Sequence, residues 1–284
     1  MQSKMMMALV AILILTGSAL ADRLDSIKQK FPAGDAKSLV VNCDFAVGHL
    51  TIGPSTTEHA ATVDAKYDAE YLRCDASYET RDGKGYLDLR SKGRRNHDHD
   101  GDIDNDWNVA LSTKLPSDIT MDIGASDLDV DLGGIPITDL NLKIGAAEGH
   151  LDFSKPNPER LREMRIDVGA SSFDCESMGN ANFESLRFNS GAASGLLDLR
   201  GQYSGECDIT IKVGAGSLDV ILPADVAVHI EADDSWLSSV DFHNENLKRL
   251  HKGVWESPGY DEAKTRMDVN IDVGIGSVDV TWKK

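Results

Sequence analysis

The stretch VNIDVGIGSVDV, residues 269–280, decides the fold, because a close relative of it, ITIKVGAGSLDV, stands at residues 209–220. In both stretches apolar residues alternate with polar ones up to a corner of small residues, and the alternation resumes beyond the corner. Alternation with a period of two is typical of β-strands that bury one face, whereas an amphipathic helix has a period of about 3.6. The two copies therefore indicate an internal repeat of strand, corner and strand.

Corners of this kind recur along the chain, and each contains a glycine. The corner glycines are Gly124, Gly145, Gly169, Gly191, Gly214 and Gly274. The first five are separated by 21, 24, 22 and 23 residues, and the last gap of 60 residues leaves room for a degenerate copy and an insertion. The corners read GASD, GAAE, GASS, GAAS, GAGS and GIGS. We expect small residues there because bulky side chains would collide with the neighbouring copies, and because glycine can adopt unusual backbone angles.

One such unit cannot bury its own apolar face, but stacked units can, with each strand paired in parallel to its counterpart in the next unit. We therefore predict an all-β protein, a single-stranded parallel β-helix (β-solenoid) of about 22-residue coils with an irregular β-rich N-terminal cap. Ile166 and Ile211 should point into its core, and the final coil, which ends at Trp282, should cover the terminal apolar column. A β-sandwich is the main alternative, but it has no reason to repeat its corners at near-constant spacing.

Composition divides the chain into four regions. The first has a charged start, a short apolar run and a small-residue A-x-A ending, which predicts a cleaved secretory signal peptide. The regions are residues 1–21 (signal peptide), 22–37 (lead-in), 38–115 (β-rich cap, with a hairpin around Asp82–Gly85) and 116–284 (β-helix, with an insertion at about 233–265). We expect an exported protein, located in the periplasm, on the outer surface or outside the cell, with no transmembrane segment in the mature chain.

The chain is strongly acidic, with a formal net charge of −18. Binding to nucleic acid depends on Lys and Arg that neutralise phosphates, so we predict no nucleic-acid partner. The surplus of carboxylates can attract cations instead.

Four cysteines are present: Cys43, Cys74, Cys175 and Cys207. An even number in an exported chain permits two disulfides, and proximity in sequence favours Cys43–Cys74 and Cys175–Cys207 among the three pairings. The alternative is four buried thiols. Because no C-x-x-C is present, neither a zinc ribbon nor a thioredoxin-type redox site is predicted.

The segment NHDHDGDIDND, residues 96–106, is a candidate calcium site. It places an acid at every second position, namely Asp98, Asp100, Asp102, Asp104 and Asp106. Clustered carboxylates suit calcium, a hard cation that needs several oxygen ligands. The EF-hand pattern fails, however, because the twelfth position counted from Asp100 is Leu111 rather than Glu. The alternative is a solvated acidic loop.

Alignment of the repeats also predicts columns of acids on one outer face. Counted from the corner glycine, the fifth position holds Asp129, Asp174, Asp219 and Asp279, and the seventh holds Asp131, Asp152, Glu176 and Asp198. Bases on the outer face of the other strand are Lys143, Arg165, Arg187 and Lys212. Equivalent positions of neighbouring coils lie about 4.8 Å apart, so such acids repel unless solvent, cations or bases intervene. The columns are either a solvated surface or a cation-bridged, partner-binding face.

The stretches SDITMDIGASDLDVDLGG, GNANFESLRFNSGAASGLLDLRG and VNIDVGIGSVDVTW resemble the bacterial toast-rack and LiaF-like C-terminal families and related adhesin β-solenoid families. The resemblance spans roughly residues 38–284. It implies a cell-envelope protein, and some members take part in sensing cell-wall stress through a membrane-bound partner. Those sensing members carry transmembrane helices ahead of the repeat, whereas this chain has only the predicted signal peptide.

Catalytic motifs such as H-E-x-x-H, G-x-S-x-G or a glycine-rich phosphate loop with Lys are missing from the sequence. We therefore predict a protein that is not an enzyme, with no catalytic residues and no cofactor other than the candidate calcium. Its expected function is to present a rigid binding surface, in an adhesin-like or scaffold role, to a protein or cell-surface component. One alternative is a regulatory partner of an envelope-stress sensor, and a second is a polysaccharide-processing β-helix enzyme. The oligomeric state stays open.

Overall fold

The computed structural model describes residues 24–94, 103–233, 237–244 and 246–284. In this part of the chain every regular element is a strand except for one 3₁₀ turn, η1 (Met178–Ala181), so the prediction of an all-β protein is confirmed. The strands are β1 (Leu24–Pro32), β2 (Ser38–Pro54), β3 (His59–Asp68), β4 (Leu72–Arg81), β5 (Lys84–Gly93), β6 (Asn105–Leu111), β7 (Ser117–Asp131), β8 (Ile137–Ile144), β9 (Glu148–Asp152), β10 (Leu161–Val168), β11 (Ser172–Glu176), β12 (Phe183–Asp198), β13 (Glu206–Pro223), β14 (Ala227–Asp233), β15 (Ser238–His243), β16 (Lys248–His251), β17 (Val254–Glu256) and β18 (Arg266–Lys283). Among these described elements, none is a helix with the length and apolar character of a membrane span.

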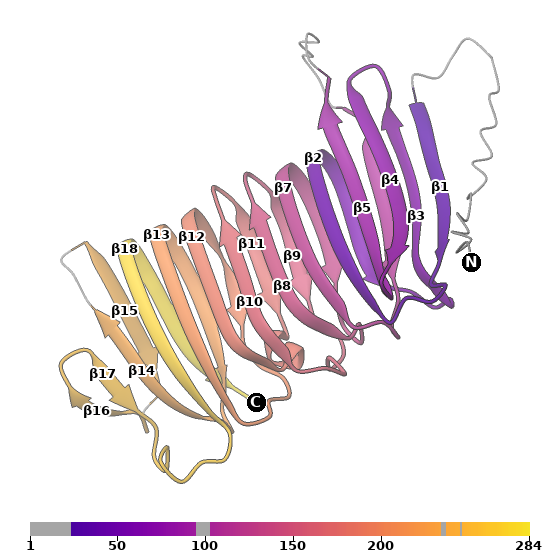
Figure 1. Ribbon diagram of the computed structural model, residues 1–284. Coiled ribbons are helices and arrows are strands. Elements are labelled where there is room, and N and C mark those ends of the chain that lie inside the picture. The colour runs from indigo at the N-terminus through magenta and orange to yellow at the C-terminus, as the bar shows by residue number, and fades with distance from the viewer. Residues whose placement is uncertain (1–23, 95–102, 234–236, 245) are drawn as a thin grey trace.

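The body of the molecule is a stack of two-limbed units whose strands pair in parallel (Figure 1). In each unit a first limb runs to the corner glycine and a second limb runs away from it. The long strands β7, β12, β13 and β18 contain both limbs, whereas the corner separates β8 from β9 and β10 from β11. The stack proceeds from β2 through β7, β8 with β9, β10 with β11, and β12 to β13. The register is the one that the sequence repeats predict, since Ile209 pairs with Val269 and Val220 with Val280.

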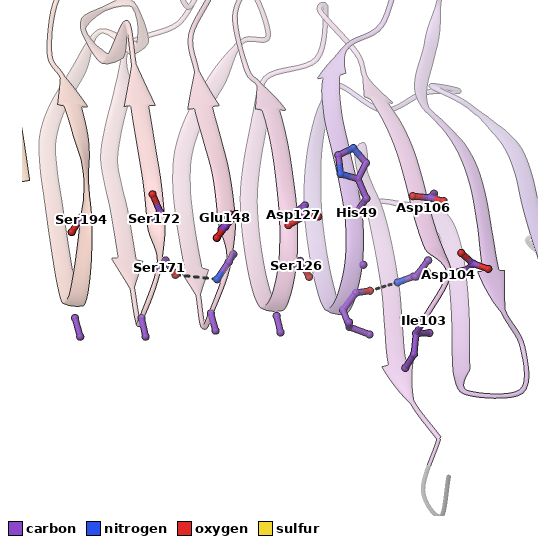
Figure 2. Close-up of a pocket in the computed structure, with 18 of the residues that line it drawn as sticks. His49, Ile103, Asp104, Asp106, Ser126, Asp127, Glu148, Ser171, Ser172 and Ser194 are labelled. Carbon is purple, nitrogen blue, oxygen red and sulfur yellow. Dashed lines mark hydrogen bonds between the residues drawn. The ribbon is translucent and has the colours of Figure 1, made fainter. Parts of the chain in front are cut away.

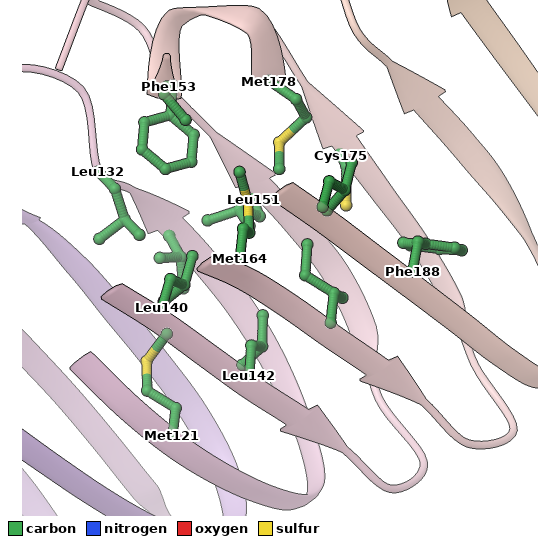
Figure 3. Packing of buried hydrophobic residues seen from close by; sticks show 14 of the residues in the cluster. Met121, Leu132, Leu140, Leu142, Leu151, Phe153, Met164, Cys175, Met178 and Phe188 are labelled. Atoms are coloured by element: carbon green, nitrogen blue, oxygen red, sulfur yellow. The ribbon is translucent and has the colours of Figure 1, made fainter. Parts of the chain in front are cut away.

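The core lies between the two limbs, where the inward side chains of both meet. Figure 3 shows Met121, Leu140 and Met164 from first limbs facing Leu151 and Phe153 from second limbs. The two residues that test the predicted orientation are buried, with Ile166 and Ile211 both 0% exposed. Burying a side chain of this size stabilises the fold by about 1.5–3 kcal/mol, and the repeat applies that gain in every unit.

Chain order and stack order differ at both ends, which corrects the prediction of a helix that winds in sequence order. The last strand, β18, lies between β13 and the pair β14 and β15. Trp282 therefore pairs with Leu222 inside the stack and does not cover its end. At the other end β2 lies between β7 and the pair β5 and β6. The physical reason at β18 is the match of its alternating apolar residues to those of β13, which places apolar side chains together in the inward columns, such as Ile211 with Ile271 and Val220 with Val280.

Antiparallel strands extend both ends of the stack. The predicted hairpin is confirmed, because β4 and β5 pair antiparallel around Asp82 and Gly83, whose φ values of 51° and 74° suit a tight two-residue turn. On the other limb, β6 pairs with β3 and β3 pairs with β1 from the lead-in. At the far end, the insertion contributes β17 and β16 beside β14.

None of the four cysteines forms a disulfide, so the favoured pairings are wrong. The alternative of four buried thiols holds for Cys43, Cys175 and Cys207, whereas Cys74 is partly exposed. Cys43 on β2 and Cys74 on β4 are kept apart by β5, which pairs with both strands. Cys175 and Cys207 lie on β11 and β13, with β12 between those strands. Burial raises the pKa of Cys43 to about 12 and that of Cys74 to about 11, so both thiols stay protonated near neutral pH.

The corner glycines are required by close stacking and not by their backbone angles. A Cβ atom at Gly169 would lie 2.3 Å from the carbonyl oxygen of Gly145, and one at Gly214 would lie 2.6 Å from that of Gly191. The corner glycines do not have positive φ, so the expectation of unusual angles at this position is wrong. Left-handed angles occur two residues later instead, at Gly216 and Gly276, with φ of 129° and 130°.

We expect Gly169→Ala to lower the free energy of unfolding by about 2–3 kcal/mol, because the added methyl group overlaps the Gly145 carbonyl of the adjacent unit. Gly53→Ala is the matched control, since a Cβ atom there meets no atom within 4 Å. Urea unfolding of both variants measures the difference. Equal stability of the two variants would contradict the steric explanation of the corner.

Candidate binding groove

The candidate calcium site lies mostly outside the described residues. Asp98, Asp100 and Asp102 lie outside the described residues, while Asp104 and Asp106 are described and exposed at the start of β6. Within the described residues, no group of three or more His, Cys, Asp or Glu side chains is arranged to hold a metal ion. Calcium binding by residues 96–106 therefore stays a prediction.

The predicted acid columns form, and several of their members have partners. The register places His150 between Asp129 and Asp174 on neighbouring units, and His150 Nε2 lies 3.2 Å from Asp129 Oδ1. Asp131 accepts a hydrogen bond of 2.6 Å from the hydroxyl of Ser154. These contacts favour a solvated, internally paired face over a cation-bridged one.

The predicted bases on the first limbs are also paired in part. Arg165 Nη2 and Arg187 Nη1 both approach the same carboxylate oxygen of Glu163, at 3.4 and 3.3 Å. Glu163 and Arg187 lie on adjacent strands, β10 and β12, so this ion pair joins neighbouring units. Exposed pairs of this kind contribute little to stability, and they reduce the net field of the face.

A different feature, which the sequence analysis did not identify as a site, is a groove of about 1200 Å³ along the corner edge. Its lining residues follow the corners of successive units from β2 to β13, as Figure 2 shows for one stretch of the row. At one end, residues 103–106 ahead of and within β6 form part of the lining. The groove is therefore a product of stacking, and no single unit contains it.

The floor of the groove is a column of apolar corner residues, one from each of six units. The column consists of Val47, Ala125, Ala146, Ala170, Ala192 and Ala215. The backbone N–H of Ala146 donates to the carbonyl of Gly124 at 3.1 Å, and that of Ala170 donates to the carbonyl of Gly145 at 2.9 Å. Because these corner groups are already paired along the stack, the floor offers methyl groups to a ligand and not a free strand edge.

A second column forms one wall and changes character along the stack. Strand pairing places Asp106, His49, Asp127 and Glu148 side by side, and Glu148 is followed in register by serines. Ser172 and Ser194 line the groove, and Ser217, Ser277 and Ser239 continue the column beyond it. The wall is therefore acidic at the β2 end and hydroxyl-bearing toward β13.

The acids of the groove have no ion-pair partner in the described part of the chain, unlike outer acids such as Asp129 and Asp139 but like Asp208 and Asp219. The lining contains no Lys or Arg. Among the described residues, none forms an ion pair with the side chains of Asp104, Asp106, Asp127 or Glu148. Like charges on directly neighbouring strands are destabilising, so this end of the groove carries an uncompensated negative potential.

Asn105 fixes the acidic end in place. Its side chain is buried, donates to the hydroxyl of Ser91 at 2.9 Å, and accepts from the indole N–H of Trp107 at 2.9 Å. Its amide also donates to the carbonyl of Val47 at the corner of β2. The carbonyl of Asn105 lies where a Cβ atom of Gly48 would be, which explains the glycine with φ of 115° at that point.

One lining residue carries an unsatisfied polar atom. Ser126 is 7% exposed, lines the groove at the corner of β7, and its Oγ has no hydrogen-bond partner in the structure. A buried hydroxyl without a partner costs about 1–3 kcal/mol. The sequence held a signal for this wall, because the fourth letter of the corner tetrads passes from Asp and Glu to Ser, but it held none for the unsatisfied hydroxyl.

Comparison with known proteins gives a family for most of the chain. The family described as "N-terminal domain of toast_rack" matches residues 21–174. The family described as "Cell wall-active antibiotics response LiaF, C-terminal" matches residues 174–280. No curated protein matches the chain.

Solved structures with a similar course of the chain are distant in sequence. One, a "putative cell adhesion protein" from Clostridium sporogenes, is 20% identical, with 92% of this chain and 100% of that chain covered and a TM-score of 0.49. A "putative adhesin" from Bacteroides fragilis is 9% identical, with coverage of 93% and 100% and a TM-score of 0.35. A "putative lipid binding protein" from Parabacteroides distasonis is 11% identical, with coverage of 91% and 96% and a TM-score of 0.35. Likeness at this level does not transfer a function.

We expect Ser126→Ala to raise the free energy of unfolding by about 1 kcal/mol, because it removes the unsatisfied buried hydroxyl. Ser117→Ala is the control, since that buried hydroxyl donates to the carbonyl of Leu115 at 2.8 Å and its loss should destabilise the protein. Urea unfolding compares the two. A loss of stability in both variants would show that Ser126 has a partner in solution.

Asp152 gives a prediction for pH dependence. Burial raises the pKa of its carboxyl, and the nearby Asp131 carboxylate adds to the rise. A folded pKa above the unfolded value means that stability falls as the pH rises from about 4 through the folded pKa. Asp152→Asn removes this loss, so its stability relative to the natural protein should increase between pH 4 and pH 7 in thermal unfolding. A difference that is constant with pH would contradict the shift.

Proposed function

The chain belongs to the toast-rack family, as a match to its N-terminal domain, and from this premise we propose that it is a non-enzymatic protein of the bacterial cell envelope that presents a rigid binding surface. The role would be adhesin-like or that of a scaffold. We place the binding surface at the groove along the corner edge.

The groove is the observation that carries this proposal. It spans the corners of successive units, has a volume of about 1200 Å³, and combines an apolar floor with a wall that is charged at one end. Sites that bind partners usually combine apolar area with a few placed polar groups. The family descriptions support the same reading more coarsely, because neither names a catalytic activity.

The mechanism we propose is shape and charge complementarity on a surface that does not move. Each limb is hydrogen-bonded to a limb on both sides through the middle of the stack, and the corner alanines take part in this ladder. A preorganised surface avoids the entropy cost of ordering on binding. We further propose that the stack is a β-solenoid with end strands out of chain order, and that residues 1–21 direct its export.

A regulatory partner of an envelope-stress sensor is the second candidate. It is favoured by the match of residues 174–280 to the C-terminal family named for the response to cell wall-active antibiotics. The two candidates use the same groove and differ in the partner, which is a surface or matrix component for a scaffold and one specific membrane protein for a regulator.

Photo-crosslinking in cells tests the location of the surface and the partner together. A photoreactive amino acid at the exposed position of Ala170, in the groove floor, should capture a partner, whereas one at the exposed position of Asp208, on the first limb outside the groove, should not. Mass spectrometry of the adduct identifies the partner. Recovery of one inner-membrane protein would favour the regulator, and recovery of surface proteins or glycan would favour the scaffold. Equal capture at both positions, or none at Ala170, would contradict the proposal.

A further inference from the structure

The two ends of the groove differ in charge, and this difference indicates the chemistry of its occupant. Its β2 end carries Asp104, Asp106, Asp127 and Glu148, while its other end is built of alanine, serine and glycine. Resting on the proposed function, we propose that the groove binds an extended basic peptide segment of a partner protein, with Lys or Arg side chains over the β2 end.

The length of the groove suits a short extended segment. Its lining passes over six successive corners, from β2 to β13. At about 4.8 Å between neighbouring strands, this corresponds to roughly 24 Å. An extended chain rises about 3.3 Å per residue, so about seven residues would fill it. A compact small molecule would use only part of this length.

Recognition must use side chains, because the floor has few backbone groups to offer. The N–H groups of Ala146, Ala170 and Ala192 donate to the corner carbonyls of the preceding units, at 3.1, 2.9 and 2.9 Å. Strand addition requires an unpaired edge, which this surface lacks at those corners. The exposed methyl groups leave a shallow floor on which small or aliphatic side chains of the segment can pack.

Charge selects a basic segment over an acidic or neutral one. Asp127 and Glu148 are direct neighbours in the parallel ladder, and Asp106 follows across His49. In the described part of the chain these three carboxylates have no basic partner, in contrast to Asp129, whose Oδ1 lies 3.2 Å from His150 Nε2. A Lys or Arg from the segment would remove the repulsion within the column and would be steered toward it from solution.

Ser126 supplies an independent indication of a ligand. It is 7% exposed, it lines the groove beside Asp127, and its Oγ makes no hydrogen bond in the structure. Unsatisfied buried polar groups are rare in folded proteins and are costly to keep. The Oγ itself has less than 1 Å² of accessible surface, so a polar group of the bound segment would complete its hydrogen bonding after the serine side chain rotates toward the groove.

An aliphatic residue marks the opposite end. Ile275 follows Ala215 in the corner column, one unit beyond the groove, and is 56% exposed. The column holds Val47 at β2 and alanine from β7 to β13, so the exposed Ile275 beyond it would contact an aliphatic side chain of a segment that continues past β13. The segment would therefore be basic at one end and apolar at the other.

The test uses a synthetic ten-residue peptide with three lysines at one end, alternating alanine and serine in the middle, and two leucines at the other end. Binding to the mature protein is measured by fluorescence anisotropy at low salt. The double variant Asp127→Asn, Glu148→Gln should bind the peptide at least about 10-fold more weakly than the natural protein. The matched control Asp208→Asn, Asp219→Asn removes the same charge from exposed positions outside the groove and should stay within about twofold.

Ser126→Ala provides a second variant that keeps its fold, since the change should stabilise the protein while weakening peptide binding severalfold. The inference is overturned if the natural protein does not bind the peptide, if a peptide with glutamine in place of lysine binds equally well, or if the control double variant loses as much affinity as the groove variant. If the peptide does not bind but crosslinking at Ala170 continues, only the inference of a basic segment is overturned, and the groove remains the proposed binding surface. If neither peptide binding nor crosslinking at Ala170 is observed, the proposed function is also contradicted.

Discussion

The structure depends on one steric fit, that of a carbonyl oxygen into the space left by a missing side chain. At Gly169, Gly214 and Gly274 the oxygen of the glycine in the preceding unit lies 2.3–2.6 Å from the position that a Cβ atom would take, and at Gly145 and Gly191 it lies 3.2 and 3.0 Å away. This contact sets the spacing and the register of neighbouring units at the corner, and parallel pairing carries that register along both limbs. The inward apolar columns then align, and the core forms as a consequence of the alignment.

The same register determines the surface, because it converts a position in the repeat into a column on the molecule. A change of one residue type along the repeats becomes a gradient in space, as in the passage from Asp127 and Glu148 to Ser172 and Ser194. The outer acid columns arise in the same way but include their own counter-groups, such as His150 beside Asp129. The groove acids have no such counter-groups among the described residues, and the partner that we propose would supply them.

Alternation, corner glycines and the Asp82–Gly83 turn are local features of the sequence, and the strands, the parallel register and the hairpin follow from them. The order of the end strands could not be predicted, because similarity between residues 209–220 and 269–280 shows that they can pair but not what lies on the other side of each. The predicted disulfide pairings were wrong for a related reason. Cys43 and Cys74 are close in sequence, but they lie on strands that β5 separates. The acidic end of the groove depends on Asn105 contacting Val47, a contact between residues 58 apart in the chain, for which no local pattern exists.

The position of β18 has a consequence for the order in which the chain assembles. Within the residues that the structure describes, the parallel neighbour of β14 and of β15 is β18, yet both strands are synthesised before it. Until β18 is synthesised, the edge of β13 therefore stays unpaired, and the strands from β14 to β17 are not joined to the stack through β18. Non-local pairing of this kind is slow, because closing the connecting chain costs conformational entropy before the stabilising contacts form. The far end of the stack can therefore form only when β18 inserts between β13 on one side and β14 and β15 on the other.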